Sequence, residues 1–313
     1  MIMLKISRRV RSCLVACLPV QLTEWADPIW RQSREIPQEF DQIMNLELHD
    51  RFHSKQGRSI VRWELGEASP SLVLFLKRHY VSGFWKGFLA RFLPDRWFKS
   101  WTWCPSREEY ENLQIAAQLQ IPVPRLIAMA EKRGPGFALQ GYLALEELAG
   151  MEPLHLVIPY AKKQLSADDF AIWKKRLIEE MVEVILKFHL QSYFHKDLYL
   201  CHFYLPLGHC SKRNPEFENQ IRLIDFHRFN RHRLRFWWFL IKDLGQLWYS
   251  SQIEGIEDAD RSYFWDRYRQ AWEEKQIRNT RFRIRHKLRT KLLSLCRPWI
   301  RYRGQRYCRH NQK

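Results

Sequence analysis

The chain has 313 residues, of which 46% are hydrophobic and 14% aromatic, and it carries a formal net charge of +18. This composition excludes global disorder and provides a sizeable core, while no apolar run reaches the roughly 20 residues that span a bilayer. The charge indicates an anionic partner, and the 14 Trp residues favour a membrane surface without excluding nucleic acid.

Residues 1–44 are assigned to an N-terminal leader. Basic residues precede a short apolar stretch at residues 13–20, which resembles the start of a signal peptide. The stretch is brief, contains Pro19 and lacks a clear cleavage site, so a surface-associating leader is the preferred interpretation.

Residues 45–148 read as a small β-rich lobe. An alternating segment and a following apolar run, joined by a turn at residues 66–70, predict an antiparallel pair of strands. The second strand is expected to end on Lys77. Residues 80–103 mix aromatic and basic side chains, which predicts either an extra helix over the sheet or a lipid-facing insertion.

One helix is predicted in this lobe, over residues 106–120. Ser106 and Glu109 fit a capping box at its start, and prolines end it. Glu109 is also the candidate partner of Lys77, since a lysine that grips phosphates needs a fixed position. Glu108 and Glu111 compete with Glu109 for this role.

Residues 149–278 read as a larger helical lobe that begins after a hinge. Apolar residues at helical spacing predict a long amphipathic helix over residues 167–189. Residues 279–313 carry twelve Lys or Arg and no Asp or Glu, which predicts a basic amphipathic tail suited to an anionic membrane surface. The alternative is a final packed helix with a solvated basic face.

The strongest chemical signal is a pair of aspartates. Asp197 stands in a loop after the long helix, within the segment FHKDL, and Asp225 follows an apolar strand. Phosphoryl transfer needs one carboxylate near the attacking hydroxyl and another that holds magnesium against the phosphates. The pair in this order therefore predicts kinase chemistry.

The surrounding motifs resemble one family. Residues 195–203 read HKDLYLCHF, residues 223–228 read LIDFHR, and residues 242–247 read KDLGQL. These segments resemble the bacterial lipopolysaccharide core kinases, which phosphorylate heptose or Kdo, and the likeness extends over roughly residues 51–251. The resemblance implies an α+β, protein-kinase-like bilobal fold, with a small β-rich N-lobe bearing one helix and a larger helical C-lobe.

The resemblance also implies roles for individual residues. Asp197 would be the catalytic base, with His195 in the same catalytic motif, and Asp225 would bind magnesium. Lys77 would contact ATP phosphates, with Glu109 positioning it, and Glu146 and Glu147 would belong to the hinge that receives adenine. Asp243 would brace the catalytic loop.

The chain departs from ordinary protein kinases in three places. His202 replaces the magnesium-binding asparagine, and because hard magnesium prefers oxygen, His202 either ligates the metal or orients Asp197 or a phosphate. His227 replaces the glycine that follows D-F. The sequence has no G-x-G-x-x-G loop, and Gly57 is the one glycine of the expected hairpin.

The expected function is phosphorylation of a heptose or Kdo hydroxyl in the lipopolysaccharide core, with ATP and Mg²⁺ as cofactors. The expected location is cytoplasmic, peripheral on the inner membrane. The expected partners are the glycolipid and an anionic membrane surface, without nucleic acid. Two alternatives stay open: a pseudokinase, and a kinase for another small molecule or a protein.

Overall fold

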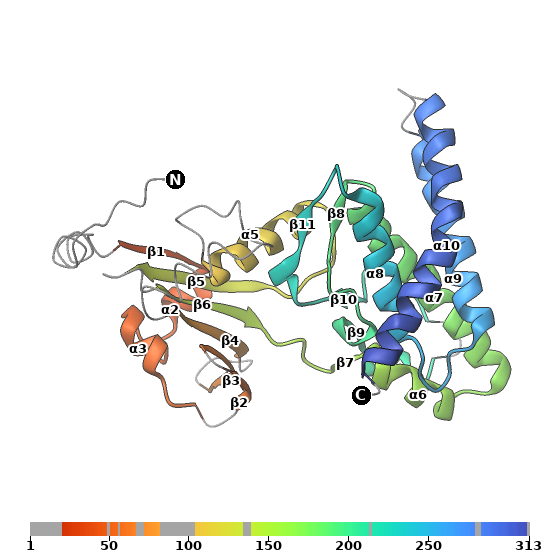
Figure 1. Ribbon diagram of the computed structural model, residues 1–313. Helices are drawn as coiled ribbons and strands as arrows, with labels where there is room; N and C mark the ends of the chain where they lie inside the picture. The colour runs from red at the N-terminus through yellow and green to blue at the C-terminus, as the bar shows by residue number, and fades with distance from the viewer. Residues whose placement is uncertain are drawn as a thin grey trace, which may run out of the picture. The chain divides into compact units, whose positions relative to one another are not determined.

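The computed structural model describes residues 21–48, 51–55, 57–66, 72–81, 104–133, 139–212, 215–278 and 283–311. Its contacts divide the chain into two compact units, residues 1–111 with 125–147 and residues 112–124 with 148–313 (Figure 1). Residues 1–20 of the predicted leader, and residues 82–103 of the predicted insertion, lie outside the described residues.

The first unit is built on a six-stranded antiparallel sheet with the strand order β1-β5-β6-β4-β3-β2 (Figure 1). Its strands are β1 (Gln21–Ala26), β2 (Arg51–Lys55), β3 (Arg58–Leu65), β4 (Leu72–Val81), β5 (Leu126–Arg133) and β6 (Leu139–Glu146). Gly57 joins β2 to β3 with a φ of 77°, and a Cβ there would lie 2.5 Å from the Tyr80 carbonyl oxygen. The turn therefore requires glycine.

Residues 21–45 belong to this sheet-containing unit. β1 pairs with β5, and α2 (Pro28–Gln32) and α3 (Phe40–Asn45) pack Trp30, Phe40 and Ile43 into the core. The leader interpretation did not anticipate these elements, because their partners lie about a hundred residues later in the sequence. It applies at most to the residues before them.

The helix predicted over residues 106–120 is α5 (Pro105–Gln118). The predicted cap was wrong, because the helix begins before Ser106 and the hydroxyl of Ser106 is buried 2.9 Å from His79 Nδ1. β4 also continues beyond Lys77 to Val81, so that Lys77 lies inside the strand rather than at its end.

The second unit is mainly helical (Figure 1). Its helices are α6 (Leu154–Gln164), α7 (Ala167–His189), α8 (Phe236–Ser250), α9 (Asp258–Arg278) and α10 (Arg283–Asn311). Its short strands are β7 (Met151–Pro153), β8 (Tyr193–Phe194), β9 (Phe203–Pro206), β10 (Arg222–Leu223) and β11 (Asn230–Arg231). The predicted helix over residues 167–189 is confirmed, since Ser166 caps it and the side chain of Ser166 accepts the Asp169 N–H.

Among the described residues, no helix combines the length and the apolar character needed to cross a bilayer.

Candidate active site

The loop after α7 is anchored by a buried carboxylate. Asp243, on α8 and without exposed surface, accepts the backbone N–H groups of His195 and Lys196, each at 2.8 Å. Hydrogen bonds to a carboxylate hold a loop more firmly than neutral ones. Lys196 has a φ of 66°, a strained conformation for a non-glycine residue that is often found at functional sites. This geometry supports the bracing role predicted for Asp243.

Asp197 follows this anchored pair and keeps 15% of its side chain exposed. Gln246 on α8 donates from Nε2 to Asp197 Oδ1 at 3.4 Å and to the Tyr199 hydroxyl at 3.0 Å. Arg228 Nη1 lies 3.1 Å from Oδ1 and 3.2 Å from Oδ2 of the same carboxylate. The predicted base is therefore an oriented carboxylate that solvent can reach.

Asp225 lies beyond β10 and also adopts a left-handed conformation, with a φ of 67°. His227 Nδ1 is 2.6 Å from Asp225 Oδ1, and His227 Nε2 is 3.8 Å from Asp197 Oδ2. One imidazole thus stands between the two aspartates. The second unit brings together the two carboxylates that the sequence analysis paired.

The donor atoms suit a magnesium ion held through one protein carboxylate. Magnesium commonly takes one or two carboxylates and completes its shell with water and phosphate oxygens, and 30% of the Asp225 side chain is exposed. His202 offers nitrogen, and its Nδ1 lies 2.7 Å from the Asp197 carbonyl oxygen. Within the described part of the chain, no cluster of three or more His, Cys, Asp or Glu side chains could hold a metal. The chemistry fits Asp225 as the ligand and His202 as a residue that orients the loop.

His195 lies beneath the loop rather than at its surface. The side chain is fully buried, and Nε2 lies 3.0 Å from the Ile224 carbonyl oxygen, to which a neutral imidazole donates. Burial lowers the pKa of His195, so the neutral form is favoured. The structure therefore differs from the predicted catalytic role, because a side chain without exposed surface cannot touch a substrate. His195 instead ties the loop of Asp197 to the strand that leads to Asp225.

The first unit contains the predicted phosphate-contacting pair. Lys77 Nζ, on β4, lies 2.5 Å from Glu109 Oε1, on α5. Glu109 is 1% exposed and the Lys77 side chain 16%, so a buried carboxylate holds a lysine that is itself partly accessible. Glu109, the preferred candidate among the three glutamates, therefore contacts Lys77.

The predicted hinge residues are already engaged within the first unit. The Glu146 N–H donates to the Arg125 carbonyl at 2.9 Å, and the Glu147 N–H donates to the Val73 carbonyl at 2.8 Å. The Glu147 carboxylate accepts two hydrogen bonds from Arg62, at 2.6 and 3.0 Å. The adenine contact remains a prediction, and at these two residues it would have to use the carbonyl groups.

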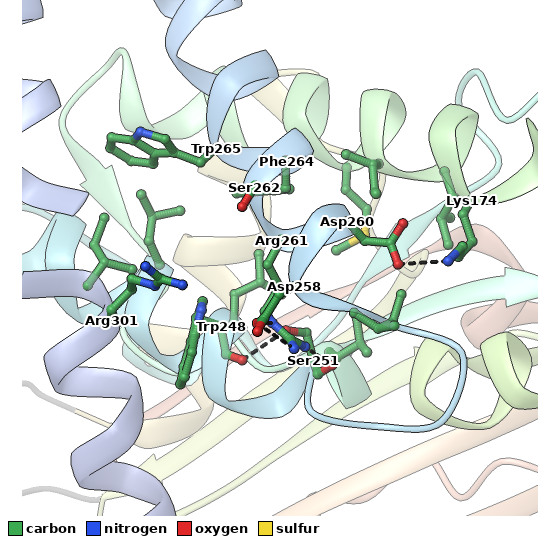
Figure 2. Close-up of a pocket in the computed structure, with 18 of the residues that line it drawn as sticks. Lys174, Trp248, Ser251, Asp258, Asp260, Arg261, Ser262, Phe264, Trp265 and Arg301 are labelled. Atoms are coloured by element: carbon green, nitrogen blue, oxygen red, sulfur yellow. Dashed lines mark hydrogen bonds and ion pairs between the residues drawn. The ribbon is translucent and has the colours of Figure 1, made fainter. Parts of the chain in front are cut away.

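A cavity of about 90 Å³ lies among α7, α8, α9 and α10 (Figure 2), and neither Asp197 nor Asp225 lines it. Its wall is mostly apolar, and Figure 2 shows the ion pair between Lys174 and Asp260, 2.7 Å long, at its edge. None of the predicted site residues lines it.

Two residues of the site were missed by the sequence analysis. Gln246 orients the Asp197 carboxylate from 49 positions later, and Arg228 contacts it from 31 positions later. Both stand inside motifs that were quoted for the resemblance, KDLGQL and LIDFHR. Their places in these motifs could have marked them as candidate site residues, but their contacts with Asp197 depend on the fold.

The antiparallel sheet unit and the helical unit define the predicted protein-kinase-like α+β fold. A solved structure described as WaaP in complex with acyl carrier protein superimposes with a TM-score of 0.60 and 18% identity, covering 91% of this chain and 98% of that one. A BubR1 kinase domain matches more distantly, with a TM-score of 0.35, 15% identity, and coverage of 58% and 46%.

The sequence profile of the lipopolysaccharide kinase (Kdo/WaaP) family matches residues 51–268, more than half of the chain. The chain belongs to this family, as the motifs predicted, and the family is one of kinases. A search among curated proteins found no match.

Proposed function

We propose that this protein transfers the γ-phosphoryl group of ATP to a sugar hydroxyl, of heptose or Kdo, in the lipopolysaccharide core. The observation that carries the proposal is the carboxylate of Asp197, which is accessible, oriented by Gln246, and placed on a loop that Asp243 anchors. Family membership supports the lipopolysaccharide acceptor.

Each predicted residue has a distinct task in this reaction. The acceptor oxygen attacks the γ-phosphorus, the bond between that phosphorus and the ADP oxygen breaks, and the hydroxyl proton passes to Asp197. Asp225 would hold magnesium, whose charge offsets that of the phosphates. Lys77, fixed by Glu109, would contact the phosphates of the nucleotide.

The test is ADP release in detergent with ATP and magnesium, with and without extracted lipopolysaccharide. Release should rise with the glycolipid in the wild type and fall to background in Asp197→Ala. Asp168→Asn removes one exposed carboxylate of α7 and should leave the rate unchanged. Equal release by the wild type and Asp197→Ala would exclude Asp197 as the base.

We also propose that the protein works at the cytoplasmic face of the inner membrane, held by one surface of the second unit. This α8–α10 surface consists of the exposed side chains of Leu234, Trp238, Leu295, Trp299 and Tyr302. On α10 the last three lie at helical spacing. Arg303, one turn beyond Trp299, stacks on Trp238 at 4.5 Å, which connects the two helices.

Basic residues border these aromatic side chains, and an amphipathic surface of Trp and Arg suits anionic headgroups. Because the WaaP structure is a complex with acyl carrier protein, a carrier protein is a competing candidate partner for this chain. Binding to protein-free anionic vesicles distinguishes the two.

One observation favours a second candidate, a catalytically silent kinase-fold protein. Asp225 Oδ1 is occupied by His227 at 2.6 Å, and His227 stands where protein kinases have glycine. Nucleotide binding without any phosphoryl transfer, in the wild type and in His227→Gly alike, would support this candidate.

A further inference from the structure

Arg228 contacts both carboxylate oxygens of Asp197, the predicted general base. It ends the 3₁₀ turn Phe226–Arg228 that follows Asp225, and its Nη1 spans both oxygens of Asp197. A general base needs its carboxylate oxygen within about 2.6–3.2 Å of the hydroxyl that it deprotonates. As long as Arg228 keeps both contacts, it competes with that hydroxyl.

The contact is suited to exchange. The Arg228 side chain is 43% exposed, and a single nitrogen makes both contacts in place of the two-nitrogen fork of a strong arginine–carboxylate pair. Exposed ion pairs of this kind are weak and are readily replaced by a better-placed anion.

Further positive charge surrounds the same carboxylate. Lys242, on α8, donates to the Lys196 carbonyl beside Asp197. Burial lowers the pKa of Lys242 and the charge of Arg228 lowers it further, while the charges of Asp197 and Asp243 raise it.

We propose that Arg228 is the residue that recognises the acceptor, by exchanging Asp197 for a phosphate or carboxylate that the acceptor carries beside its reactive hydroxyl. This inference rests on the proposed function. Lys242 adds positive charge beside Asp197. An anionic acceptor draws the guanidinium away and frees the base, whereas a neutral acceptor leaves the base covered. The arrangement therefore selects anionic sugars.

The experiment compares acceptors and variants in one matrix of KM and kcat values. The acceptors are extracted lipopolysaccharide, the same material after dephosphorylation, and the same material after reduction of its carboxyl groups. The proteins are the wild type, Arg228→Ala, Arg228→Lys, and Arg176→Ala as a control that removes an exposed arginine from α7. Thermal unfolding shows that each variant is folded.

Arg228→Ala should raise KM for the intact acceptor by about 10- to 100-fold, the range of a lost hydrogen bond to a charged group, and leave KM for ATP unchanged. Arg228→Lys should have a KM between those of the wild type and Arg228→Ala, because lysine keeps the positive charge but cannot bind the anion through two nitrogens. Removal of the recognised anion should raise the wild-type KM at least to the level of Arg228→Ala and lower the wild-type kcat, because Arg228 then stays on Asp197. The same treatment should leave KM and kcat of Arg228→Ala unaffected. The acceptor treatment that does so identifies phosphate or carboxylate as the ligand.

If Arg228→Ala loses the same share of wild-type activity on the intact and on the neutralised acceptors, the inference is overturned while the kinase function stays in place. The absence of phosphoryl transfer to every acceptor by the wild type would overturn the proposed function, and the inference with it.

Discussion

At the scale of single residues, the site depends on buried groups that never touch a substrate. Asp243 has no exposed surface and satisfies two backbone N–H groups, and Gln246 turns the Asp197 carboxylate. The KDLGQL motif pointed to Asp243, whereas the role of Gln246 follows from a contact that local sequence does not encode. For His195 the local motif was misleading. Its place two residues before Asp197 suggested a catalytic role, but the fold buries the His195 side chain.

Asp243→Asn should destabilise the protein by about 1.5–3 kcal/mol, because the amide cannot accept both backbone N–H groups as a charged carboxylate does. The activity of the folded fraction should also fall, since the loop of Asp197 loses its anchor. Urea unfolding and steady-state rates measure the two effects. Asp168→Asn, at an exposed site, should stay within about 0.5 kcal/mol of the wild type. A full-activity Asp243→Asn protein would contradict the bracing role.

At the scale of elements, strands and helices with strong local patterns could be predicted and long-range pairings could not. The apolar spacing and the Ser166 cap define α7, and alternation defines β3. β1 has no such signal, because its edge position follows from pairing with β5. The same limit explains why Lys77 was wrongly placed at the end of its strand, since the extent of β4 depends on its neighbours β3 and β6.

The ion pair between Lys77 on β4 and Glu109 on α5 leads to a further prediction. Glu109→Gln should weaken binding of ATP about tenfold or more and destabilise the protein by about 3 kcal/mol, because a largely buried lysine loses its counter-charge. Titration with a fluorescent ATP analogue and urea unfolding test this. Glu111→Gln, on an exposed face of the same helix, is the matched control. Equal effects of the two substitutions would refute the positioning role of Glu109.

At the scale of the whole molecule, the composition predicts an anionic partner, and we propose the α8–α10 surface of the second unit as the place where it binds. Trp238→Ala with Trp299→Ala should reduce binding to phosphatidylglycerol vesicles about tenfold or more, as the loss of buried apolar area predicts. Binding should also weaken as salt shortens the Debye length from about 10 Å at 0.1 M to about 3 Å at 1 M.

Sedimentation with vesicles measures this binding, and Tyr160→Ala removes an exposed aromatic side chain from α6 as a control. Unchanged binding by the double Trp variant would move the membrane contact away from this surface. Binding to acyl carrier protein in place of vesicles would identify a protein partner.

The most direct test of the central claim is the transfer of labelled γ-phosphoryl from ATP to extracted lipopolysaccharide, with the acceptor sugar located by mass spectrometry. The wild type and Asp168→Asn should place label on a heptose or Kdo hydroxyl, and Asp197→Asn should place none above background. Label transferred equally by Asp197→Asn, or found on protein and absent from the glycolipid, would contradict the central claim.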